Sequence, residues 1–64
     1  MEPITEKEWL GLELIDAIKR AEKIGYTYRV VEENGVSFML TQDFKSNRVN
    51  LRLSDRKVIG LYTG

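Results

Sequence analysis

The spacing of apolar residues changes at Gly25, and this change constrains the fold more than any other feature of the 64-residue chain. After Gly25 apolar and polar residues tend to alternate, which is the period of a strand. Before it, six apolar residues recur every three or four positions, which is the helical period: Leu10, Leu14, Ala17, Ile18, Ala21 and Ile24. The sequence therefore predicts an α+β fold, with one helix and a small sheet, in a single domain over residues 1–64.

The predicted helix has a clear end and two candidate starts. Gly25 follows the last periodic residue and can adopt the left-handed conformation that ends a helix. Thr5 and Glu8 have the spacing of a capping box, which predicts one long helix from Thr5. Gly11 costs about 1 kcal/mol inside a helix. The alternative is therefore a break at Gly11, with Trp9 packing as part of a separate lead-in.

Strands are predicted from β-branched and aromatic residues at Tyr26–Val31, Arg48–Leu53 and Val58–Tyr62. Residues 54–57 have the composition of a turn. The pair Asn34-Gly35 is typical of a hairpin turn and predicts pairing of residues 30–32 with 37–40.

In the predicted strand Arg48–Leu53, polar and apolar residues alternate strictly. Its apolar residues are therefore expected to face the core, and its polar residues to share the opposite face. The core-facing set is Val49, Leu51 and Leu53, and the opposite set is Arg48, Asn50 and Arg52.

The absence of Cys and His argues against several function classes. Without them the chain lacks disulfides, thiol chemistry and the commonest acid–base group and metal ligand. The serines have no His to activate them, so we expect no enzyme, and the acidic pairs lack the spacing of a metal-binding loop, so we expect no metal or cofactor. The chain contains no stretch of 18 apolar residues, so we expect no membrane partner. The first eight residues do not resemble a signal peptide. These features predict a cytoplasmic protein or a mature exported form.

Charge is balanced overall, with ten bases and ten acids, but it is unevenly distributed. Residues 1–34 hold five bases and eight acids, a charge of −3, and residues 35–64 hold five bases and two acids, a charge of +3. The asymmetry is interpreted as attraction between helix and sheet rather than as a basic face for a ligand.

Four pieces of the chain carry a family likeness by their order and spacing. They are Trp9-Leu10-Gly11 followed by Asp16-Ala17-Ile18-Lys19, then Arg29-Val30-Val31, then the run from Thr41 to Leu51, and Val58-Ile59 followed by Tyr62-Thr63-Gly64. Together they resemble the potato inhibitor I family of serine protease inhibitors, the chymotrypsin inhibitor 2 and eglin type, and above all its short bacterial relatives. The resemblance spans most of the chain.

The resemblance implies a helix packed on a small mixed β-sheet with an extended exposed binding loop. It implies a substrate-like loop at Thr41, Gln42, Asp43 and Phe44, with Gln42-Asp43 as the reactive bond. The implied support of the loop is Arg48, Asn50 and Arg52, and the implied partner is a serine protease of the subtilisin- or chymotrypsin-like class.

Three features depart from the family pattern. Gln42 matches neither the cation that trypsin-like pockets prefer nor the apolar side chain that chymotrypsin-like pockets prefer, which leaves the target open. The stretch from Gly35 to Thr41 is about two residues longer than in the family. Thr63 stands where many bacterial members have a Cys.

Two alternatives belong to other classes. One is a non-catalytic protein-binding module on the same fold, which would use the hairpin or an edge strand as its contact. The other is a small nucleic-acid-binding domain, which zero net charge disfavours. That site would use Arg29, Lys45, Arg48, Arg52, Arg56 and Lys57, with Tyr28 or Phe44 for stacking.

Overall fold

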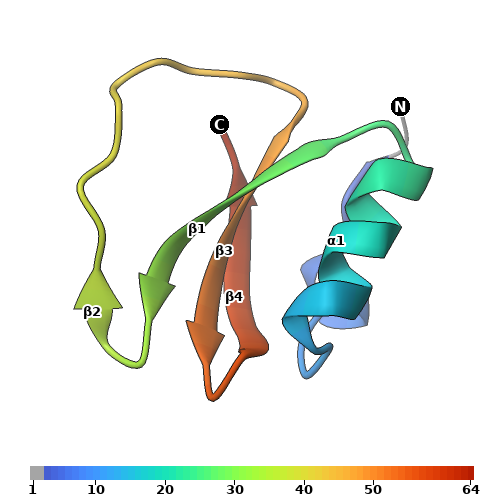
Figure 1. Cartoon of the computed structure of the whole chain (residues 1–64). Helices are drawn as coiled ribbons and strands as arrows, with labels where there is room; N and C mark the ends of the chain where they lie inside the picture. The colour runs from blue at the N-terminus through green and yellow to red at the C-terminus, as the bar shows by residue number, and fades with distance from the viewer. Residues whose placement is uncertain (1–2) are drawn as a thin grey trace.

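The protein is one α-helix packed on one face of a four-stranded sheet, as seen in a computed structural model that describes residues 3–64 (Figure 1). The strand order is β2-β1-β3-β4; β1 and β3 are parallel and the outer pairs are antiparallel, so the sheet is mixed. The α+β prediction is confirmed. The elements are η1 (Glu6–Glu8), α1 (Leu14–Lys23), β1 (Thr27–Glu33), β2 (Val36–Ser37), β3 (Arg48–Ser54) and β4 (Lys57–Thr63).

The chain before α1 forms a separate lead-in with Trp9 buried, so of the two candidate helix starts the break at Gly11 is confirmed and the long helix from Thr5 is wrong. Thr5 makes no side-chain capping bond, and the short 3-10 turn η1 ends before Gly11, whose φ is +88°. Two backbone bonds of 2.9 Å, from Gly11 N to Val58 O and from Val58 N to Leu12 O, fasten this lead-in to β4. The predicted helix end is confirmed, because α1 stops two residues before Gly25, whose φ is +86°.

The core lies between α1 and the sheet, and its centre is the apolar face of β3. Val49, Leu51 and Leu53 are completely buried, which confirms the face predicted from their alternation. Ala17 and Ala21 are the fully buried residues of α1, and their small side chains allow the helix to lie close to the sheet. Trp9, Tyr26 and Val58 complete the buried cluster.

The hairpin at Asn34-Gly35 forms, but it is shorter than predicted. Both turn residues have positive φ, +52° and +81°, which is the geometry that this residue pair accommodates. The paired residues are Glu32 with Ser37 and Glu33 with Val36. One further bond, from Phe38 N to Val31 O at 3.0 Å, extends the pairing to residue 38, while residues 39 and 40 lie outside it.

The two hairpin turns are tied to each other. Asn34 Oδ1 accepts a hydrogen bond of 2.8 Å from the backbone N–H of Asp55 in the β3–β4 turn. Ion pairs also join β1 to the chain around β3, with Arg52 3.3 Å from Glu32 and Arg56 3.8 Å from Glu33. Among residues 3–64 the ion pairs that link the acidic and basic halves therefore lie along the sheet, not between helix and sheet as the charge asymmetry suggested.

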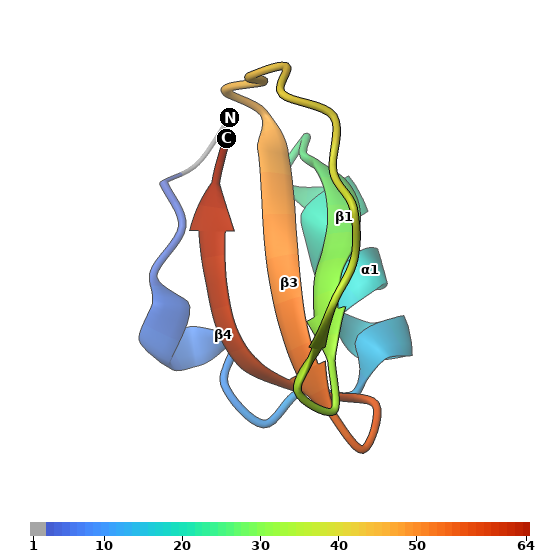
Figure 2. The same cartoon turned by 90° about the vertical axis from the view of Figure 1, so that its left-hand side faces the viewer.

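Residues 38–47 connect the edge strand β2 to the central strand β3. Figure 2 views the sheet from the face opposite α1 and shows this segment rising past β1 and passing over the end of β3 and β4. Every residue from 34 to 47 is exposed to solvent. The chain becomes buried abruptly at Arg48, where β3 begins.

Candidate functional site

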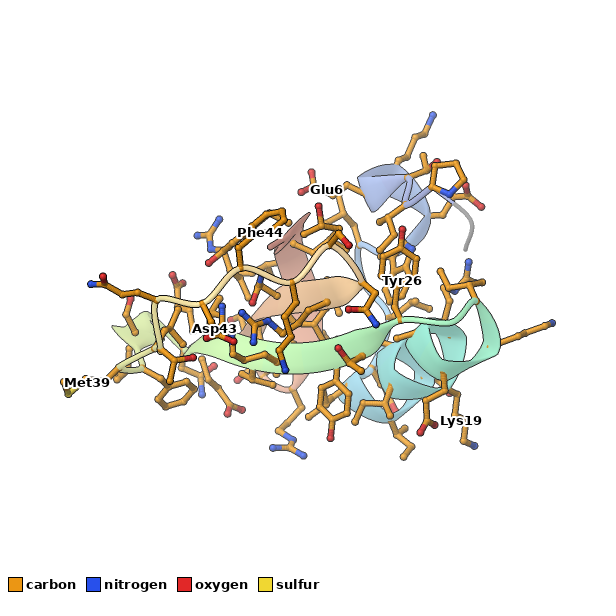
Figure 3. The ribbon with its side chains drawn as sticks, turned by 90° about the horizontal axis from the view of Figure 1, so that it is seen from above. Glu6, Lys19, Tyr26, Met39, Asp43 and Phe44 are labelled. Carbon is orange, nitrogen blue, oxygen red and sulfur yellow. The ribbon has the colours of Figure 1, made fainter. Side chains whose placement is uncertain are left out.

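Thr41–Phe44 lie in the exposed segment beyond the end of the sheet, and polar residues of β1 and β3 reach up to them. Figure 3 shows Asp43 on the side of the segment that faces the sheet, with Phe44 beside it and Met39 at the far end of the molecule. The site is therefore a surface strip of chain with a polar network beneath it, rather than a cleft.

Arg48 is the centre of that network. It is only 7% exposed, because it opens β3 directly beneath the segment. Its Nη2 donates to the backbone oxygen of Asp43 at 2.7 Å, its Nη1 lies 3.4 Å from Asp43 Oδ2, and its Nε donates to Gly64 O at 2.9 Å. One rigid guanidinium thus joins the segment, the start of β3 and the residue that follows β4.

The Asp43 carboxylate is held on both of its oxygens. Thr41 Oγ1 donates to Asp43 Oδ1, while Asp43 Oδ2 faces Arg48. The bond from Thr41 lowers the pKa of Asp43, as do the backbone N–H of Asp43 itself and the positive charges of Arg48 and Lys45, in that order. The network therefore favours an ionised Asp43 folded back between Thr41 and Arg48.

Asn50 and Arg29 form a second contact with the segment. Asn50 is completely buried; its Oδ1 accepts from Arg29 Nε at 2.8 Å, and its Nδ2 donates to Tyr62 O at 3.3 Å and to Gly64 O at 3.4 Å. Arg29 Nη1 then lies 3.5 Å from both the backbone oxygen and the Oγ1 of Thr41, two contacts at the limit of hydrogen bonding.

The sequence did not predict that Arg29 supports Thr41. Its strand was recognised, but its partner depends on the parallel register of β1 and β3, which places Arg29 opposite Asn50. The alternation of residues within β1 could have shown which face of the strand carries Arg29. It does not show that β3 is the neighbouring strand.

Arg52 does not lie where the predicted supporting role requires. Its Nε bonds to Glu32 Oε1 at 3.3 Å, and its side chain lies over Gly60, where a Cβ would come within 3.2 Å of Nη1. This position corrects the expectation that Arg52 holds residues 41–44. The physical reason is distance along the strand, since Arg52 is two positions further from the segment than Asn50.

Gln42 and Phe44 extend from the segment into solvent. Gln42 makes no hydrogen bond within residues 3–64. Phe44 is 76% exposed, more than any other aromatic residue. One edge of its ring lies against Gly64, where a Cβ would be 3.5 Å from Cδ2 and Cε2.

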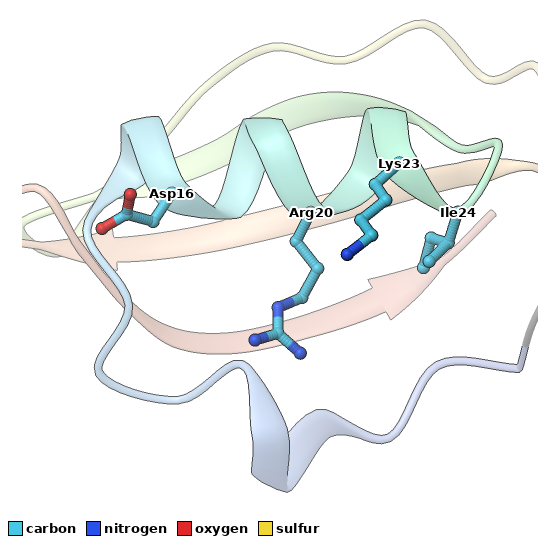
Figure 4. A pocket seen from close by; sticks show the side chains of 4 residues that line it. All are labelled: Asp16, Arg20, Lys23 and Ile24. Carbon is cyan, nitrogen blue, oxygen red and sulfur yellow. The ribbon is translucent and has the colours of Figure 1, made fainter.

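A separate hollow of about 510 Å³ lies along α1 and is lined by Asp16, Arg20, Lys23 and Ile24 (Figure 4). Its charges are of both signs and its three charged residues are exposed, so it has no built polar site. Within residues 3–64 no three acidic residues gather into a group that could hold a metal ion. In the same range, the structure contains no helix with the length and apolar content that a membrane span requires.

Comparison of the chain with protein-family models, with curated proteins and with solved structures found no match.

Proposed function

We propose that the chain is a serine protease inhibitor that presents Thr41–Phe44 as a substrate-like loop with Gln42-Asp43 as its reactive bond. The proposal rests on the likeness of the sequence to the potato inhibitor I family and on the geometry around this one bond. Thr41 and Asp43, the residues on either side of Gln42, are both contacted by side chains of the sheet, while the Gln42 side chain makes no hydrogen bond within residues 3–64.

The observation that carries the proposal is the Arg48 bond of 2.7 Å to the backbone oxygen of Asp43. On the other side of Gln42, Arg29 lies 3.5 Å from the backbone oxygen of Thr41. A loop that is held firmly at Asp43 and contacted weakly at Thr41 has less conformational entropy to lose when it binds. Gln42 itself is exposed and its carbonyl makes no backbone hydrogen bond within residues 3–64, so the carbonyl is accessible to a protease.

The same contacts explain how such a loop resists cleavage. When the protease serine attacks the carbonyl carbon of Gln42, the bond to the Asp43 nitrogen breaks and Asp43 becomes the leaving group. Arg48 holds the Asp43 backbone oxygen and carboxylate, and keeps the new amine beside the acyl group. Because the amine stays close, it can reform the bond faster than water replaces it.

The test is incubation with subtilisin-, elastase-, chymotrypsin- and glutamyl-peptidase-like enzymes, with residual activity and the mass of the inhibitor followed over time. The proposal expects tight inhibition of at least one enzyme and slow cleavage at Gln42-Asp43 alone. Rapid digestion at many sites, or no effect on any enzyme, contradicts it and favours the protein-binding module.

Arg48→Ala and Arg52→Ala form a matched pair of variants for this test. Arg48→Ala removes the contacts to Asp43 and should convert a slow inhibitor into a substrate that is cleaved at the same bond much faster. Arg52→Ala removes a partly exposed pair with Glu32 and should leave inhibition unchanged. Equal behaviour of the two variants would exclude the supporting role of Arg48.

Four of the six candidate cations of the nucleic-acid alternative already have partners or are buried. Arg48 is buried, Arg29 bonds to Asn50, and Arg52 and Arg56 pair with acids of β1. Guanidinium groups that already have partners are poorly placed to neutralise phosphates.

A further inference from the structure

Asn34 lies at the point where the two hairpin turns of the sheet meet. Its backbone N–H donates to Leu53 O at 2.9 Å, and its Oδ1 accepts from the N–H of Asp55 at 2.8 Å. These two bonds form a turn clasp that joins the β1–β2 turn to the end of β3 and the β3–β4 turn. Both bonds depend on one exposed residue, so a chemical change at Asn34 acts on both turns.

The residue that follows Asn34 makes its side-chain amide the most reactive of the chain. Gly35 has no Cβ, so its backbone nitrogen can approach the side-chain carbon of Asn34 with little steric hindrance. The other asparagines, Asn47 and Asn50, are followed by an arginine and a leucine. Asn50 is also completely buried, and both of its amide atoms have partners. Asparagine is a thermolabile residue, and here the lability is concentrated at Asn34.

We propose that Asn34 is a site of spontaneous deamidation and that the turn clasp controls its rate. The Gly35 nitrogen attacks Cγ of Asn34, a C–N bond forms and closes a succinimide ring, and the bond from Cγ to Nδ2 breaks. The proton lost by the Gly35 nitrogen leaves with Nδ2 as ammonia. Nδ2 makes no hydrogen bond within residues 3–64, so its departure breaks no contact. Water then adds to either ring carbonyl, the C–N bond at that carbonyl breaks, and the Gly35 nitrogen regains a proton.

The clasp keeps the reacting groups of Asn34 and Gly35 apart in the folded protein. While Oδ1 is bonded to Asp55, the side-chain amide is directed at the β3–β4 turn, and it must rotate toward its own main chain before the attack. The backbone bond to Leu53 restrains the same residue. Deamidation therefore requires the clasp to open, and its rate follows the fraction of molecules in which the clasp is open.

The two products of ring opening differ in whether they can close the clasp again. An aspartyl residue keeps a carboxylate oxygen in the place of Oδ1, which can still accept from Asp55. An isoaspartyl residue routes the main chain through the former side chain and adds one carbon between positions 34 and 35. Because the two-residue turn sets the pairing of Glu33 with Val36, an extra main-chain atom disturbs that register. The isoaspartyl form should therefore loosen β2, which leads into the exposed segment 38–47.

The first test follows deamidation of wild type at mildly alkaline pH, in buffer and in denaturing guanidinium chloride, by peptide mapping and mass spectrometry. Asn34 should be modified before the internal controls Asn47 and Asn50 in both solutions. In buffer its rate should be lower by roughly tenfold or more, because the clasp is closed in most molecules. Earlier modification of Asn47 or Asn50, or an unmodified Asn34 in denaturant, would overturn the assignment of the site.

Amide hydrogen exchange tests control by the clasp. In guanidinium chloride below the unfolding transition, deamidation of Asn34 should accelerate in proportion to exchange of the Asp55 N–H, which reports the opening of the same bond. Exchange of the Leu51 N–H, at the buried centre of β3, reports global unfolding. A deamidation rate that follows Leu51, or that stays constant while Asp55 exchanges faster, would show that the clasp does not control the reaction.

Asn34→Asp is the matched control for the isoaspartyl product, which chromatography separates and an isoaspartyl-specific methyltransferase identifies. Asn34→Asp should retain exchange protection of the Asp55 N–H and of the Phe38 N–H, which donates to Val31 O. The isoaspartyl form should lose protection at both. Equal protection in the two forms would show that the turn accommodates the extra carbon, and would overturn the predicted loosening of β2.

Discussion

Arg29 Nε donates a 2.8 Å hydrogen bond to Oδ1 of Asn50, and this bond places a guanidinium from β1 beneath a segment that β3 also supports. Asn50 keeps its amide group directed at Tyr62 O and Gly64 O, so its orientation is fixed by three partners. The support of Thr41 therefore depends on side chains from two parallel strands that are 21 residues apart in sequence.

The Arg29–Asn50 bond should appear as an energetic coupling between the two residues. In a double-mutant cycle of Arg29→Ala and Asn50→Ala, we expect a coupling of about 1 kcal/mol in the free energy of unfolding, because each single variant already removes the shared bond. Urea denaturation of the four proteins measures it. The control cycle pairs Arg29→Ala with Arg56→Ala, whose side chain contacts Glu33, and should be additive. Additivity in the first cycle would contradict the structure.

Arg48→Ala should destabilise the protein by about 2 kcal/mol, because it leaves oxygens of Asp43 and Gly64 without their charged donor. Arg52→Ala should cost no more than about 1 kcal/mol, because its bond to Glu32 is a partly exposed surface pair. Thermal unfolding distinguishes the two. A larger loss for Arg52→Ala than for Arg48→Ala would be incompatible with the observed burial.

Acid should weaken the network around Asp43. Its pKa is lowered in the folded protein, first by Thr41 and then by its own backbone N–H and by nearby cations, so its contribution to stability is complete above its ordinary value of 3.8. That contribution is lost as the pH falls through the lowered folded value. The stability difference between wild type and Asp43→Asn should therefore be constant near neutral pH and shrink in acid. A difference that does not change with pH down to the acid limit would contradict this assignment.

The β3–β4 turn should tolerate a stabilising substitution. Arg56 has a φ of +66°, a conformation that costs a residue with a Cβ about 1–2 kcal/mol. Arg56→Gly should therefore raise stability by about 0.5 kcal/mol after the greater freedom of glycine in the unfolded chain is subtracted. Lys57→Gly is the control, since Lys57 begins β4 without a positive φ and should lose stability. Chemical denaturation of both variants checks the opposite signs.

The close approach of α1 to the sheet should make its buried face intolerant of larger side chains. Ala21→Leu adds three carbons at a fully buried position and should cost about 1–3 kcal/mol by overpacking. Glu22→Leu, on the exposed side of the same helix, should change stability by less than about 0.5 kcal/mol. If thermal unfolding shows the two to be equivalent, the packing of α1 on the sheet is wrong.

The elements with strong local signals were predictable from sequence. Gly25 ends the helix because the left-handed conformation needs no Cβ there, and Asn34-Gly35 turns the chain because both residues accept positive φ. The alternation of Val49, Leu51 and Leu53 identified the core because a strand with one buried face must repeat every two residues.

The remainder depends on contacts between distant residues. The break at Gly11 was one of the two predicted alternatives, but the sequence could not choose between them, because the bonds that join Gly11 and Leu12 to Val58 of β4 are contacts between distant residues. The same applies to Arg52, for which the family resemblance implied a supporting role, whereas its side chain bonds to Glu32 of the neighbouring strand. Arg29 lies near Thr41 only because β1 and β3 are parallel. The sequence of neither strand predicts this parallel pairing.

The parallel pairing of β1 and β3 has a consequence for a chain cut at Gln42-Asp43. The first fragment would contain α1, β1 and β2, and the second would contain β3 and β4, so the centre of the sheet would become an interface between two chains. The core cluster would be shared in the same way, with Ala17 and Ala21 on one side and Val49, Leu51 and Leu53 on the other. A nicked molecule would thus behave as a heterodimer whose persistence depends on dilution.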